Sequence, residues 1–184
     1  MSTAKKLALI VLLLTTTLAF ARKRDPLTDA EADQLRQVAM EPQKRLQLYI
    51  KFTQVRLDGI DQARSDPKQA QGRGNTIHNL LEDFTSLIDE INDNLDQYEG
   101  RPLDKDQTKE FHKGIREVIT AEERFRARLR TLRHDIDTDP QTKTESRDYV
   151  FVLQDAEDAL KSSLDAAQEY AKEKDEGKPE GKQK

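Results

Sequence analysis

Residues 105–136 read KDQTKEFHKGIREVITAEERFRARLRTLRHDI, and apolar side chains recur along this stretch at every third or fourth position. The stripe consists of Phe111, Ile115, Val118, Glu122, Phe125, Leu129, Leu132 and Ile136. Steps that alternate between four and three residues form a heptad repeat, which places these positions on one face of an α-helix. The pattern predicts a helix over about 105–135, with the charged Glu122 on its buried face.

The same spacing recurs on both sides of this stretch. Residues 42–64 and 75–98 carry apolar stripes in steps of three and four, and residues 144–173 carry a second heptad stripe. That stripe consists of Tyr149, Leu153, Ala156, Leu160, Ser163, Ala167 and Tyr170. No segment of useful length alternates with the period of two that a half-buried strand requires. The pattern therefore predicts four long helices.

A short fifth helix is expected before them. Thr28 and Glu31 have the spacing of a capping box, which predicts a helix over about 28–40 that Pro42 ends. We expect an all-α domain over 28–173, built as an antiparallel up-down four-helix bundle with this short extra N-terminal helix. The competing architecture is a long antiparallel coiled-coil hairpin that dimerises.

Composition excludes several classes of protein. The chain has 184 residues, with 35 acidic and 31 basic side chains, a net charge of −4 and no Cys. The absence of Cys excludes a disulfide scaffold and Cys-ligated zinc or iron–sulfur sites. The acidic balance argues against nucleic acid as a partner. The sequence has no Gly-rich phosphate loop, G-x-S-x-G or H-E-x-x-H motif, so we expect no enzyme, no catalytic residues and no cofactor.

The first 21 residues have the three-part pattern of a secretory signal peptide. Lys5 and Lys6 precede an apolar run over 7–14, and Ala19 and Ala21 supply the small residues of a cleavage site. The apolar run is shorter than the roughly 20 residues that span a bilayer. We expect residues 1–21 to be removed and the rest to be exported to the periplasm or the medium.

The residues around the expected domain are polar. Arg22, Lys23 and Arg24 lie in a linker over 22–27, and basic residues directly after a signal peptide resist translocation. The alternative is therefore a protein tethered by an uncleaved N-terminal segment, with no other membrane contact. Residues 174–184 are rich in Lys, Glu and Gly and are expected to be a disordered tail.

Glu122 is the candidate for a polar core residue. Counting turns along antiparallel helices places Arg56 near its height, which predicts an Arg56–Glu122 ion pair at mid-bundle. Such a pair fixes register more than it stabilises, because the cost of desolvation offsets the Coulomb attraction. The alternative, Glu122 as a metal ligand or acid–base group, is disfavoured because the sequence lacks the Glu-x-x-His motif of di-iron bundles.

Metal candidates are weak. Asp135, Asp137 and Asp139 have the spacing that opens a calcium-binding EF-hand loop, but Pro140 replaces the turn Gly and Ser146 replaces the bidentate Glu. The histidines are His78, His112 and His134. They share no register, which argues against zinc. We expect no metal, with weak calcium binding as the alternative.

Two surface patterns are candidates for interfaces. Leu48, Phe52 and Val55 form a second apolar stripe on the helix over 42–64, and we expect the short first helix to cover it. The alternative is a homodimer surface.

Charges are also segregated by helix. Asp89, Asp93 and Asp96 line one face of the helix over 75–98. The arginines of the next helix are Arg124, Arg126, Arg128, Arg130 and Arg133. We expect solvated faces with weak salt bridges, and the alternative is a charged docking surface for a partner.

Three segments carry a resemblance to known proteins. Leu27–Arg36, Lys44–Tyr49 and Ile77–Asp83 resemble uncharacterised exported helical-bundle proteins of bacteria, which implies the fold but no activity. The Leu27–Thr28 pair is more weakly similar to the helix starts of Spy/CpxP-type periplasmic chaperones, with Glu31 where those proteins have Gln. Those chaperones use a basic cradle, whereas this chain is acidic.

These features predict an exported, non-enzymatic helical bundle that binds or scaffolds a macromolecular partner, expected to be a protein, in the cell envelope. The alternative is a periplasmic chaperone or stress-sensing bundle. A weak metal-binding bundle is the third reading.

Overall fold

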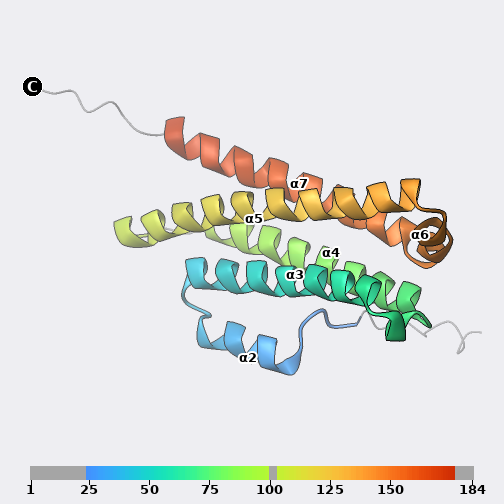
Figure 1. Cartoon of the computed structure of the whole chain (residues 1–184). Coiled ribbons are helices and arrows are strands. Elements are labelled where there is room, and N and C mark those ends of the chain that lie inside the picture. The colour runs from blue at the N-terminus through green and yellow to red at the C-terminus, as the bar shows by residue number, and fades with distance from the viewer. Residues whose placement is uncertain (1–23, 100–102, 177–184) are drawn as a thin grey trace, which may run out of the picture.

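The computed structural model of the chain describes residues 24–99 and 103–176 (Figure 1). The helices are α2 (Asp29–Gln37), α3 (Pro42–Ser65), α4 (Arg73–Glu99), α5 (Lys105–Thr138), α6 (Pro140–Glu145) and α7 (Val150–Glu176). Single 3₁₀ turns at Pro67–Gln69 and Ser146–Asp148 lie between them. These two described ranges contain no strand, which confirms the all-α prediction for them. The predicted signal peptide, residues 1–21, lies outside the described residues.

Local sequence explains where the helices begin. The Thr28 hydroxyl accepts a hydrogen bond from the backbone N–H of Glu31, and the Glu31 carboxylate accepts one from the backbone N–H of Thr28. Asp104 and Gln107 form a second capping box at the start of α5. Pro42 occupies the first turn of α3, where its missing N–H costs no helical hydrogen bond.

The connection between α5 and α7 differs from the prediction. Asp139 alone separates α5 from α6, and its carboxylate accepts a hydrogen bond from the backbone N–H of Thr142. Pro140 follows in the first turn of α6, where a fixed φ suits a helix start. A separate short helix thus replaces the expected loop, and α7 begins at Val150 rather than near Thr144.

Other helix ends also differ from the predicted limits. Gly72 has a φ of 84°, which glycine adopts without steric cost, and α4 begins directly after it at Arg73 instead of at residue 75. At the other end of the chain α7 continues to Glu176, past the predicted limit of 173. Residues 177–184 of the predicted tail lie outside the described residues.

The four long helices pack so that α3 and α7 each contact both α4 and α5 (Figure 1). Hydrogen bonds between α3 and α5 join residues 67 to 74 positions apart, so these two neighbours run parallel. Those between α4 and α7 join residues 71 and 74 positions apart, and this pair is parallel as well. The helices α4 and α5 are consecutive in the chain, yet they occupy opposite corners.

The predicted stripes line the space between these helices. All eight stripe positions of α5 are buried, and so are Tyr149, directly before α7, and the stripe positions of α7 from Leu153 to Ala167. The rings of Phe84 in α4 and Phe125 in α5 meet across the core, edge to face, with centroids 6.0 Å apart. This geometry aligns the positive edge of one ring with the negative face of the other.

Truncating this aromatic contact tests the core. Phe125→Ala is expected to lower the free energy of unfolding by about 3–5 kcal/mol, because it removes buried area and leaves a cavity. The matched control is Phe151→Ala, since the Phe151 side chain is 80% exposed and a surface change costs within about 0.5 kcal/mol. Urea unfolding followed by circular dichroism measures both, and equal losses would contradict the described core.

Candidate functional site

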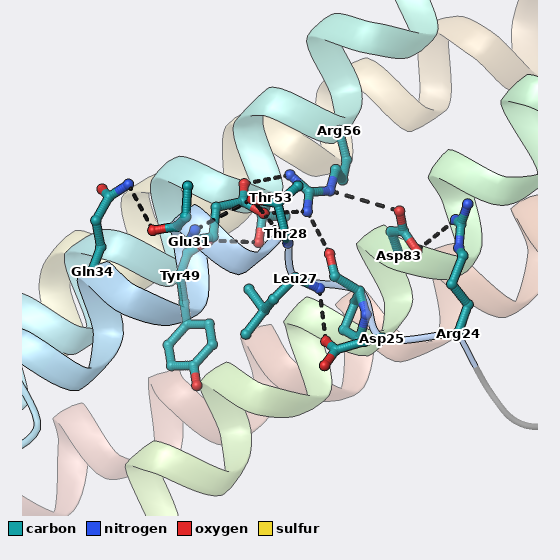
Figure 2. A network of polar contacts seen from close by, with 12 residues as sticks. Arg24, Asp25, Leu27, Thr28, Glu31, Gln34, Tyr49, Thr53, Arg56 and Asp83 are labelled. Atoms are coloured by element: carbon teal, nitrogen blue, oxygen red, sulfur yellow. Dashed lines mark hydrogen bonds and ion pairs between the residues drawn. The ribbon is translucent and has the colours of Figure 1, made fainter.

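Arg56 of α3 attaches the N-terminal segment to the rest of the fold (Figure 2). We call residues 24–37 the N-terminal strap. The buried Arg56 guanidinium donates to both carboxylate oxygens of Glu31, at 2.6 and 2.7 Å, and to the backbone carbonyl of Pro26. A bidentate pair of this kind fixes orientation as well as distance.

Asp83 of α4 gives the strap a second attachment. Its carboxylate accepts a hydrogen bond from Arg24 at 2.7 Å and lies 3.8 Å from Nε of Arg56 (Figure 2). Burial raises the pKa of Asp83 even though both arginines favour its charged form. Burial also acts to raise the pKa of Glu31, but hydrogen bonds from Arg56 and Thr28 hold it below its usual value. The charges of this network thus hold two helices and the strap together.

The predicted ion pair between Arg56 and Glu122 is therefore wrong. Arg56 points away from the core toward the strap, whereas Glu122 is fully buried and accepts a hydrogen bond from Ser163 of α7. The prediction gave Glu31 only a capping role, although its carboxylate also serves Arg56. Counting turns placed Arg56 near the height of Glu122, but it could not show which way each side chain points, and this set the wrong partner for Glu122.

The strap covers most of the second apolar stripe of α3. Phe52 is only 2% exposed and Leu48 is partly buried, while Val55 remains 47% exposed. Leu27 and Leu35 of the strap belong to the same apolar cluster. Phe52 is therefore not available for the alternative homodimer surface, whereas Val55 remains exposed.

Glu122, Ser163 and Asn92 form a polar contact inside the bundle. The Ser163 hydroxyl oxygen lies 2.6 Å from Oε1 of Glu122 and 2.8 Å from Oδ1 of Asn92. One hydroxyl proton serves only one of these oxygens. The ionised Glu122 carboxylate accepts from Ser163, whereas a protonated Glu122 can donate to Ser163 and so leave the hydroxyl proton for Asn92. Burial raises the pKa of Glu122 to about 7, even though the Ser163 hydrogen bond acts to lower it.

The aspartates singled out for calcium do not form a loop. Asp135 and Asp137 lie within α5, and Asp135 accepts a hydrogen bond from Arg64 of α3. Asp139 caps α6. Two residues along a helix place side chains on different faces, so helix continuation separates Asp135 from Asp137.

The histidines are also apart. His78 in α4 has its Nδ1 2.8 Å from the backbone oxygen of Asp148, and His112 and His134 lie on α5. Within 24–99 and 103–176 no group of three or more His, Cys, Asp or Glu side chains is placed to hold a metal ion.

A hollow of about 450 Å³ lies between the parallel helices α3 and α5. Its lining residues are Gln47, Ile50, Lys113, Arg116, Glu117, Thr120 and Arg124. Arg116 and Arg124 are exposed, and neither has an acidic partner within the described part of the chain. Gln47 donates to Glu117 at 2.9 Å, and Lys113 lies 3.8 Å from the same carboxylate. We call this surface the basic groove.

Sequence reasoning missed the basic groove, because it did not place α3 beside α5. The structure also gives the arginines predicted along α5 different partners. Arg128 pairs with Asp58 and Asp61 of α3, and Arg133 pairs with Glu157 of α7. The interleaving of these arginines with the stripe of α5 was visible in the sequence, but their partners depend on which helices are adjacent.

Breaking the Arg56–Glu31 pair tests the strap. Arg56→Met is expected to lower the free energy of unfolding by about 3 kcal/mol, because it leaves the Glu31 carboxylate buried without its partner. Adding Glu31→Gln to that variant restores part of the loss, and a double-mutant cycle measures the coupling. The matched control is Arg36→Met, which removes an exposed pair with Asp33 and leaves stability unchanged. An equal effect of Arg36→Met would contradict this role of Arg56.

Glu122 is expected to make stability depend on pH. The pKa of Glu122 is about 7 in the folded chain, against an ordinary value of 4.5. Its contribution to the free energy of unfolding is therefore complete below pH 4.5 and is lost as the pH rises to about 7. In that window the unfolded chain has released a proton that the folded chain keeps, and unfolding becomes easier by about 1.4 kcal/mol per pH unit.

Denaturant unfolding at several pH values measures this slope. Glu122→Gln should flatten it between pH 4.5 and 7, and Glu122→Leu should preserve or raise the melting temperature at pH 8. The matched control Glu123→Gln, on the exposed side of α5, should keep the slope. A slope that survives in Glu122→Gln, or a Glu122→Leu variant that does not fold, would contradict the assignment.

Comparison with known proteins finds no match for this chain. No family model matches the chain, and neither the curated proteins nor the solved structures contain a significant match. The function of the strap, of Glu122 and of the basic groove therefore has to be argued from their own contacts.

Proposed function

We propose that this chain is an exported, non-enzymatic protein, folded as an up-down four-helix bundle, that binds or scaffolds a protein partner in the cell envelope. The signal-peptide pattern of residues 1–21 supports export to the periplasm or the medium. None of the helices in 24–99 or 103–176 is both long and apolar enough to cross a membrane.

The basic groove is the observation that carries this proposal. Lys113, Arg116 and Arg124 bring three cations to one hollow in a protein whose net charge is −4. Exposed arginines without acidic partners are available to pair with carboxylates of another protein. Ile50 adds a partly buried apolar side chain beneath them. A hollow with an apolar floor and charged walls suits recognition of a partner.

The buried polar groups support the non-enzymatic reading. Arg56 uses its guanidinium to hold the strap, and Glu122 faces the bundle interior, where its environment excludes solvent. Both groups therefore have roles in the fold.

Glu122 favours one second candidate, a stress-sensing bundle that responds to pH. A fully buried carboxyl that ionises near pH 7 couples proton concentration to the stability of the core. For a bundle with that role, Glu122→Gln would abolish the pH dependence of its activity, whereas variants of the basic groove would leave that pH dependence unchanged.

Site-specific crosslinking tests the leading proposal. A photoreactive amino acid at Thr120 in the basic groove is expected to give a discrete adduct in cells that export the protein. Arg116→Glu combined with Arg124→Glu should reduce the yield about ten-fold or more, as loss of charge pairs worth about 1.4 kcal/mol implies.

The control places the same photoreactive group at Phe151, which is 80% exposed and lies on α7. Fractionation of the same cells reports whether the protein is outside the cytoplasm. Equal labelling at both positions, or retention in the cytoplasm, would contradict the proposal.

A further inference from the structure

The molecule carries a second charged hollow beside α4. Its volume is about 900 Å³, and its lining residues are Arg24, Asp25, Pro26, Ser86, Asp89, Glu90 and Asp93. Asp96 continues the exposed acidic side of α4 by one turn. We call the α4 side of this hollow, with Asp89, Asp93 and Asp96, the acidic face.

The acidic face and the basic groove carry opposite charges, and the acidic face is short enough to lie within the length of the groove. Lys113 and Arg124 span about 16 Å along α5, and Asp89 and Asp96 span about 10 Å along α4, at 1.5 Å per helical residue. Each surface therefore presents its charges over two to three helical turns. Opposite charges brought together on this scale steer association and fix its register.

We infer that a second copy of this chain occupies the basic groove and places its acidic face there. This inference rests on the proposed function and names the partner of the same groove. Asp93 of one copy then faces the exposed Arg116 and Arg124 of the other.

The net charge favours a second copy over an extended polyanion. A nucleic acid or an anionic membrane meets the whole molecule, whose net charge of −4 repels it. A second copy also carries the net charge of −4, but it makes contact over a small area, where screening beyond about 10 Å leaves the local charges to decide. The acidic face supplies its carboxylates from a rigid helix, so little backbone conformational freedom is lost on docking.

The placement of the two surfaces determines the kind of assembly. α4 and α5 occupy opposite corners, each between α3 and α7. Docking the acidic face of one copy into the basic groove of another uses two different surfaces, and it leaves one groove and one acidic face of the pair available to further copies. The contact is therefore heterologous, and it propagates from copy to copy into open chains.

Sedimentation velocity of the protein, in the form in which exporting cells accumulate it, tests this inference. At low ionic strength, where the Debye length is about 30 Å, the mean mass should rise continuously with protein concentration. In 1 M salt, where that length is about 3 Å, the protein should be a monomer. A monomer at both ionic strengths, or a dimer that does not grow, would overturn the inference.

Charge exchange identifies the surfaces. One variant combines Arg116→Glu and Arg124→Glu, and the other combines Asp89→Arg and Asp93→Arg. Each alone should remain monomeric, because its two surfaces then have the same sign, and an equimolar mixture should regain association. The matched control combines Arg126→Glu and Arg130→Glu, which line the hollow between α5 and α7, and should associate like the parent.

Circular dichroism first shows that each variant is folded, and a mixture that stays monomeric overturns the inference. The crosslinking experiment separates this failure from failure of the proposed function. A monomeric protein that still gives a groove-dependent adduct of a different protein at Thr120 overturns only the second copy as occupant. If the protein neither associates with itself nor gives a groove-dependent adduct at Thr120, the proposed function is overturned as well.

Discussion

The apolar stripe of each long helix can leave water only by facing the stripes of the others, since one face of a single helix cannot be buried against itself. Phe84 and Phe125 meet across that shared space from opposite corners. The requirement explains why Glu122 remains inside: its position on the heptad is fixed by the apolar residues one turn before and after it. Ser163 then supplies a polar contact to one carboxyl oxygen of Glu122, while the other, Oε2, has no hydrogen-bond partner within the described residues.

Charged groups behave differently on the two sides of this core. Glu122 is removed from solvent and holds its proton to about pH 7, whereas Glu31 stays ionised because Arg56 replaces the water it loses. Toward the surface, Arg116 and Arg124 stay solvated and unpaired within the described ranges. Glutamate and arginine side chains therefore make the stability of the core depend on pH, hold the strap or remain available for contact, according to their burial and their neighbours.

Periodicity was sufficient to predict the four long helices and their buried faces, because each stripe position depends only on residues one turn away, but it did not predict the short α6. Thr28 and Glu31 likewise revealed their capping box, since the interaction is local. The partners of Arg56 and Glu122 could not be found this way, because they depend on which helices touch. Consecutive helices were taken as neighbours, and the pairing of α3 with α5 created the basic groove, which no local pattern encodes.

The parallel pairing of α3 with α5 also affects how the chain folds. Hydrogen bonds between these helices join residues about 70 positions apart, whereas α3 meets α4, and α5 meets α7, through short connections. Local contacts form faster than distant ones, because less chain entropy is lost in closing a small loop. Each helical hairpin can therefore assemble before the two join, and their union is the late step that closes the core around Glu122.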